Sequence, residues 1–159
     1  MVSEERGKVE ITENLFKYKT SHEHQNAYFK SKSFEIPIDE LKVVGIYYTM
    51  ILDDDANILV FVDQKNRKYF ISVDFDLQTD SISKILESFK LDENILSPNY
   101  ENYDKGNSYV LYPQSLTNVA LYRKKNFIES FLWGVFKVFQ IKYIGDGLLS
   151  KEVKDFTKK

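Results

Sequence analysis

The stretch VVGIYYTMILDDDANILVFVDQKNRKYFISVDF, residues 43–75, decides the fold class. Three of its runs are rich in β-branched and aromatic residues, which favour strands: 43–52, 58–62 and 68–75. The residues between these runs are mostly Asp, Asn, Gln, Lys and Arg, and Asp and Asn favour turns because their side chains bond the local backbone. Three strands joined by short polar turns predict an antiparallel meander.

Shorter alternating segments precede the meander. Apolar and polar residues alternate in 9–11, 16–18 and 33–38, as they do in half-buried strands. Pro37 cannot donate a ladder hydrogen bond, so we expect the third of these strands at a sheet edge or a strand end. Together with the meander, these segments predict an antiparallel sheet of five to seven strands in a β-rich region, residues 8–76.

Helical periodicity appears only after the sheet region. Apolar residues spaced i, i+3, i+4 and i+7 predict a helix over 80–90 with Asp80 as its N-cap. The polar residues 92–107 predict a long loop, and residues 116–156 form a C-terminal helical part whose main helix spans 126–141. We therefore expect one α+β domain, residues 1–159: an antiparallel, meander-rich sheet packed by two main helices.

The helix predicted over 126–141 carries the most information about contacts. Asn126 suits the N-cap position, and Glu129 three residues later is typical of a capping box. On a helical wheel one broad apolar face, expected to pack in the core, collects seven residues: Phe127, Ile128, Phe131, Leu132, Val135, Val138 and Phe139. Trp133 falls inside the opposite polar arc, and Phe136 lies at the edge of that arc.

Trp133 has three interpretations: burial by other parts of the chain, an exposed patch that binds a partner, and contact with a membrane surface. In the first, other parts of the chain cover it, since large aromatic side chains are usually well buried. In the second, Trp133 and Phe136 form an exposed patch that binds a partner, because Trp is enriched at interface hot spots. Tyr100 and Tyr103, in the expected 92–107 loop, are further candidate binding residues, since Tyr-rich loops suit protein recognition. Packing of that loop onto the sheet is the alternative.

The charge pattern bears on the class of partner. The net charge is -2 and the sequence pI is about 5.8, which disfavours nucleic acid as a partner. Residues 121–159 hold nine Lys/Arg and four Asp/Glu, a net charge of +5, so the rest of the chain carries -7. This basic third supports attachment to a membrane surface as an alternative, with Lys residues meeting anionic headgroups. A solvated helix and tail would also have this composition.

Few residues point to catalysis. The sequence has no Cys, which excludes a thiol nucleophile and any cysteine–zinc site. His22 and His24 are the only histidines, and no third metal ligand accompanies them. We therefore expect no catalytic residue, metal site or cofactor. An alternative hypothesis is a small-ligand or hydrolytic enzyme that uses Asp74 and Asp76 as a carboxylate pair under the 92–107 loop.

Part of the chain resembles a bacterial pleckstrin-homology-like domain. The resemblance is carried by FEIPIDELKVV (34–44), ILVFV (58–62), KYFISV (68–73) and the helix at 81–89, so it covers residues 34–89. In that family an Ile-Pro step enters a strongly twisted meander that a helix caps. The resemblance implies a β-roll that serves as a binding scaffold. It does not imply phosphoinositide binding, because 53–55 are all Asp where the family has a basic loop.

These observations favour a non-enzymatic, cytoplasmic protein-binding domain, of a scaffold or immunity type, whose partner is another protein or a second copy of the chain. The cytoplasmic expectation rests on the acidic residues near the N-terminus, where a secretory signal would be basic. No apolar run approaches the roughly 20 residues that a spanning helix needs.

Overall fold

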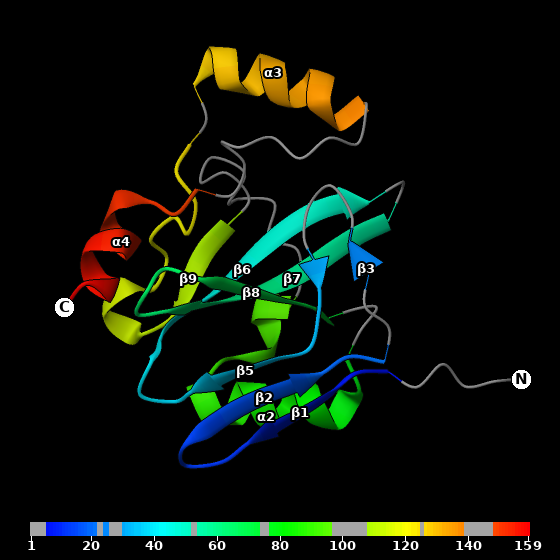
Figure 1. The fold of residues 1–159 in the computed structure, drawn as a ribbon, viewed down its shortest axis with the longest axis vertical. Coiled ribbons are helices and arrows are strands. Elements are labelled where there is room, and N and C mark those ends of the chain that lie inside the picture. The colour runs from blue at the N-terminus through cyan, green and yellow to red at the C-terminus, as the bar shows by residue number, and fades with distance from the viewer. Residues whose placement is uncertain are drawn as a thin grey trace, which may run out of the picture.

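The computed structural model describes eight ranges of the chain: 6–21, 24–25, 30–51, 54–73, 77–96, 108–124, 126–138 and 148–159. Over these ranges the protein is α+β, as predicted. It has a three-stranded and a four-stranded antiparallel sheet, a short two-stranded ladder, and several helices (Figure 1). The strands that we expected in one sheet are therefore divided between two.

The first sheet has the order β1-β2-β5, formed by Lys8–Ile11, Leu15–Lys19 and Phe34–Pro37. Alternate residues of its strands point into the core, and Val9 is paired with Tyr18 and Phe16 with Ile36. β5 is an edge strand that ends at Pro37, which confirms the expectation for that residue. A separate ladder joins β3 (His24–Gln25) to β4 (Lys30–Ser31).

The second sheet has the order β8-β7-β6-β9 and contains the predicted meander. Its strands are β6 (Leu41–Ile51), β7 (Asp54–Asp63), β8 (Lys68–Ser72) and β9 (Ser108–Tyr112). The turn predicted at 53–57 is wrong for its last four residues, because β7 begins at Asp54 and pairs with Ile51 of β6. The long cross-strand ladder outweighs the local turn preference of Asp and Asn.

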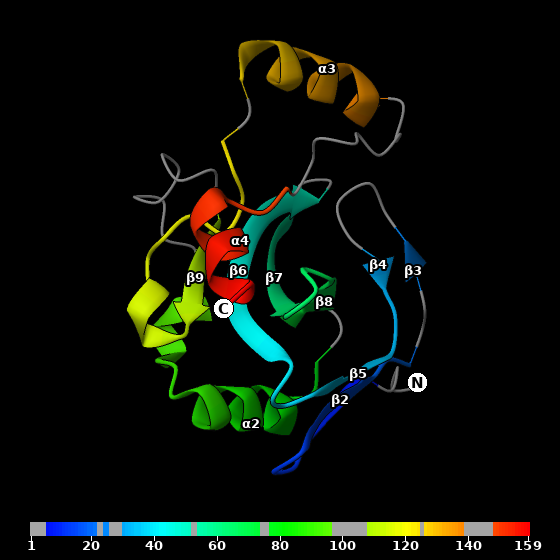
Figure 2. The ribbon, with the colours of Figure 1, turned by 60° about the vertical axis from the view of Figure 1, so that its left-hand side comes forward.

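The two faces of β7 enter two separate cores. Leu59 and Phe61 pack with the first sheet and with α2 (Thr79–Phe89), whose Ile85 is buried. Val60 and Val62 pack on the other face with Leu121 and with α4 (Lys151–Thr157). Figure 2 shows α2 and α4 against different parts of the two sheets. One face of the second sheet is thus covered by the first sheet and α2, and the other face by α4 and the segment around Leu121.

Gly45, in the central strand β6, allows a close approach between the sheet and the segment after β9. A Cβ atom built at Gly45 would lie 2.7 Å from Cδ2 and 2.9 Å from Cδ1 of Leu121. The hydrogen in place of a side chain therefore makes room for Leu121, whose exposed fraction is 0%.

Two local expectations need correction. The N-cap of α2 is Gln78, without a side-chain capping bond, and Asp80 lies in the first turn, where a carboxylate favours the positive end of the helix. The expected 92–107 loop contains a 3-10 turn, η1 (Glu93–Leu96), and 97–107 lie outside the described residues. A second 3-10 turn, η3 (Gln114–Leu116), follows β9.

Asp63 organises the turn between β7 and β8. Its carboxylate is fully buried and accepts hydrogen bonds from the amides of Lys65 (2.8 Å) and Arg67 (2.9 Å). It also accepts bonds from Arg67 Nε (2.6 Å) and the Tyr69 hydroxyl (3.1 Å). Burial alone would raise the pKa of Asp63, but these bonds outweigh it and hold that pKa below its usual value.

Candidate functional site

Residues 122–123 and 148–149 meet at one place in the fold, on either side of α3 in the sequence. Arg123 N donates to Leu148 O at 2.8 Å, and Tyr122 pairs with Leu149 in an isolated antiparallel bridge. The two ends of the segment between Arg123 and Leu148 are therefore hydrogen-bonded to each other. The helix α3 (Phe127–Val138) lies within it and stands apart from both sheets in Figures 1 and 2.

The first turn of α3 is fixed by side-chain bonds. Asn126 Oδ1 accepts from Glu129 N at 2.8 Å, and Glu129 Oε2 accepts from Asn126 N at 3.0 Å, which confirms the predicted capping box. Both terminal nitrogens of Arg123 donate hydrogen bonds to the Glu129 carboxylate: Nη1 to Oε2 at 2.9 Å and Nη2 to Oε1 at 2.5 Å. Arg123 thereby joins the base of the segment to the start of the helix.

The apolar side of α3 is exposed. Phe127 is 88% exposed, Ile128 68%, Phe131 66% and Val135 41%, and we call these four residues the α3 apolar face. The expectation that they pack in the core is wrong. The helical wheel correctly places them on one side of the helix, but the two faces of the second sheet are already packed against the first sheet, α2 and α4.

The candidate residues chosen from the sequence are only partly described. Trp133 and Phe136 lie on α3, the helix that carries the α3 apolar face, but their side chains lie outside the described part of the structure. Tyr100 and Tyr103 lie wholly outside the described residues, as do Asp74 and Asp76 of the enzyme alternative. The contact expected around Trp133 therefore stays a prediction.

Sequence reasoning missed the α3 apolar face as a candidate surface. The periodicity of an apolar stripe is the same whether the stripe packs on its own sheet or faces a partner. One usable signal was present: apolar residues occupy most of the circumference of this helix, more than one packed face requires. A helix of this kind is usually buried on several sides.

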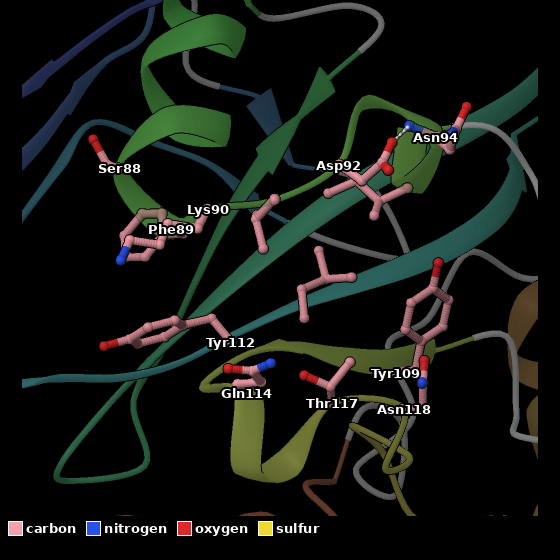
Figure 3. Close-up of a pocket in the computed structure, with 13 residues that line it drawn as sticks. Ser88, Phe89, Lys90, Asp92, Asn94, Tyr109, Tyr112, Gln114, Thr117 and Asn118 are labelled. Atoms are coloured by element: carbon pink, nitrogen blue, oxygen red, sulfur yellow. Dashed lines mark hydrogen bonds between the residues drawn. The ribbon is translucent and has the colours of Figure 1, made fainter.

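A groove of about 940 Å³ lies between the C-terminal end of α2 and the β9–η3 segment, and we call it the α2–β9 groove. Its apolar lining includes Phe89, Leu91 and Leu111. Figure 3 shows residues of α2 and η1 across the groove from Tyr112, Gln114 and Thr117. Tyr112 is 37% exposed, and its ring meets the ring of Phe89 edge-on, with 5.3 Å between centroids.

Hydrogen bonds to the sheet hold the η1 side of this groove in place. The Tyr48 hydroxyl donates to Ile95 O at 2.7 Å and lies 2.9 Å from the Tyr109 hydroxyl. Asn57 Nδ2 donates to Leu96 O at 2.8 Å. Burial, and then the bond to Tyr109, raise the pKa of Tyr48, so the phenol stays protonated at physiological pH.

The described ranges also bear on metal binding and on membrane insertion. Among these residues, no three or more His, Cys, Asp or Glu side chains gather in a way that would hold a metal ion. No helix within the same ranges has the length and apolar character needed to cross a membrane.

Comparisons of the chain with known proteins found no matching family model, no matching curated protein and no matching solved structure. They do not bear on the pleckstrin-homology-like resemblance, which stays a prediction. The α3 apolar face and the α2–β9 groove are therefore interpreted from their own geometry.

Proposed function

We propose that this chain is a non-enzymatic protein-binding domain that presents α3 to a partner. The observation that carries the proposal is the α3 apolar face, with Phe127 88% and Phe131 66% exposed on one side of one helix. Single exposed apolar residues are ordinary on protein surfaces, but a contiguous group of large ones is typical of an interaction surface.

The spacing of the exposed residues suits insertion of the helix into a groove. Ile128, Phe131 and Val135 stand at i, i+3 and i+7, the spacing of side chains that anchor an amphipathic helix in an apolar groove. Leu132, at i+4, is half-buried. The partner that this helix fits is a protein with an apolar groove.

The capping contacts support the same proposal. Arg123 and Asn126 fix the first turn of α3 through Glu129, so the helix is formed before it meets a partner. A helix that is already ordered loses less conformational entropy on binding than a disordered segment does. This arrangement favours a stable recognition element over one that folds on contact.

A photo-crosslinking residue placed at position 131 of the full chain tests the proposal. In a lysate of the source cells we expect adducts with a defined protein, and excess unlabelled chain should suppress them. The matched control carries the same crosslinker at Glu13, an exposed residue of the first sheet's hairpin. An identical set of adducts from both positions would contradict the proposal. Co-sedimentation with anionic vesicles and no protein adduct at position 131 would favour the membrane alternative instead.

A further inference from the structure

We infer that the partner of α3 is a second copy of the same chain. In this arrangement the α3 apolar face of each protomer docks in the α2–β9 groove of the other protomer, around a two-fold axis. The inference rests on the proposed function, because it names the occupant for the same face of α3.

The protein carries both halves of one contact: the α3 apolar face and the α2–β9 groove. Among the described residues, large exposed apolar side chains occur in two places: on α3 and at Tyr112. Tyr112 lines the α2–β9 groove, whose volume of about 940 Å³ lies within the range of pockets that enclose ligand groups. A single contact between α3 and the groove would therefore cover both places.

One side of α3 alone offers less contact area than a stable interface needs. α3 has 12 residues, so at about 1.5 Å per residue it is roughly 18 Å long and turns about three times. Stable interfaces bury about 1,200–2,000 Å² in total, and one side of a three-turn helix is small against that value. A two-fold arrangement uses the helix–groove contact twice, and it closes after two copies.

The two elements that would meet carry opposite net charges. The described residues 123–124 and 126–138, which contain α3, have three Lys/Arg and one Glu, a net charge of +2. The segment 77–96, which contains α2 and η1, has four Asp/Glu and two Lys, a net charge of -2. Opposite net charges on the two segments favour the approach of α3 to the groove of another protomer.

α3 is placed to reach the groove of another molecule and not the groove of its own chain. α2, which forms one side of the groove, lies at the opposite end of the molecule from α3 in Figures 1 and 2. The bond from Arg123 to Glu129 holds the first turn of α3 at the base of its segment. The contact between α3 and the groove is therefore made between protomers.

Light scattering on the purified full chain is the first test. We expect a dimer, and we expect Phe131→Asp to shift the mass to that of a monomer while circular dichroism shows a folded protein. Ser130→Asp is the matched control, because Ser130 is exposed on another side of α3, and it should leave the dimer intact. A monomeric wild-type chain at all concentrations, or a Phe131→Asp dimer, would overturn the inference.

Engineered disulfides test the docking geometry, and the absence of native Cys makes the readout clean. A mixture of Phe131→Cys and Thr117→Cys chains should form a cross-linked pair under mild oxidation, because Thr117 lines the groove. Phe131→Cys mixed with Glu13→Cys should not. If Phe131→Cys alone cross-links as readily as the mixture, the helices pair with each other and the groove assignment is overturned.

The two proposals fail in distinguishable ways. A monomeric chain that still gives adducts specific to position 131 in the lysate overturns self-association and leaves the protein-binding function standing with another partner. A monomeric chain without such adducts overturns both.

Discussion

Arg123 and Glu129 form a bidentate ion pair that joins the chain just before α3 to the first turn of that helix. Its N–O distances are 2.9 and 2.5 Å. The Glu129 carboxylate also caps the backbone of Asn126. One acidic side chain thus links the place where the chain leaves the body to the start of the exposed helix.

Glu129→Ala should loosen α3 without unfolding the body. The variant loses the cap and the ion pair, and caps of this kind stabilise a helix by about 1 kcal/mol. For the monomeric chain we expect faster hydrogen exchange over 127–138 and a nearly unchanged melting temperature, since α3 stands apart from the core of its own chain.

Two further variants separate the contributions of Glu129. Glu129→Gln keeps an oxygen at the capping position but loses the charge opposite Arg123, so its exchange rates should fall between those of Glu129→Ala and the native chain. Ser130→Ala, at the next residue, changes neither contact and should leave the exchange of α3 close to native. An equal effect of Ser130→Ala would contradict the assigned role of Glu129.

Gly45→Ala and Gly134→Ala should have opposite effects. The new methyl group at Gly45 would meet Leu121 Cδ2 at 2.7 Å inside the core, so we expect a loss of about 1–3 kcal/mol in unfolding free energy. At Gly134, on α3, no atom outside the adjoining helix backbone lies within 4 Å of the new methyl group, and Ala favours a helix over Gly by about 1 kcal/mol. Denaturant titration measures the first effect, and hydrogen exchange of α3 measures the second. A stabilising Gly45→Ala would refute the close packing of Leu121.

Asp63→Asn should destabilise the protein at neutral pH and much less in acid. The folded-state pKa of Asp63 is below its unfolded value, so the ionised carboxylate stabilises the fold above about pH 4. That contribution is lost as the pH falls through the lowered folded-state pKa. From the usual strength of bonds to a charged group, we expect a difference of about 2 kcal/mol at pH 7. Urea titrations of both chains from pH 7 to pH 3 measure this difference in unfolding free energy. A difference that stays the same across this pH range would contradict the stabilising role of the ionised Asp63 carboxylate.

Thr157→Val should weaken the contact between α4 and the turn after β7. Thr157 Oγ1 donates to Asn66 Oδ1 at 2.6 Å, and Asn66 has a left-handed backbone with φ of 60°. Loss of one such bond costs about 1 kcal/mol. Thr157→Ser keeps the hydroxyl and should stay near the native unfolding free energy in the same titration. A loss in Thr157→Ser as large as that in Thr157→Val would contradict the assignment of the effect to the hydroxyl bond.

The sheet could be predicted from the sequence where local and tertiary preferences agree. The runs around Val44, Val60 and Ile71 are rich in β-branched residues and form the paired strands of the meander. The start of β7 could not be predicted, because Asp54 and Asn57 prefer turns by themselves and become strand residues only through pairing with β6. Cross-strand pairing is not visible in a local stretch of sequence.

At the candidate site, too, local features could be predicted from the sequence, but tertiary packing could not. The capping box at Asn126 and Glu129 depends on residues three apart, so the start of α3 was predictable. Exposure of Phe131 was not, because it depends on whether other helices have already covered the sheets. α2 and α4 pack on the sheets through contacts between residues far apart in the sequence. These contacts determine whether the sheets leave room for α3.

The bridge between Tyr122 and Leu149 makes the segment between them a separable insert. Because its two ends meet, a short tight turn in place of residues 124–147 would leave β9 and α4 joined as they are. The same junction could accept a helix grafted from another protein. Substitutions on the exposed side of α3 therefore leave the strands and their two cores unchanged.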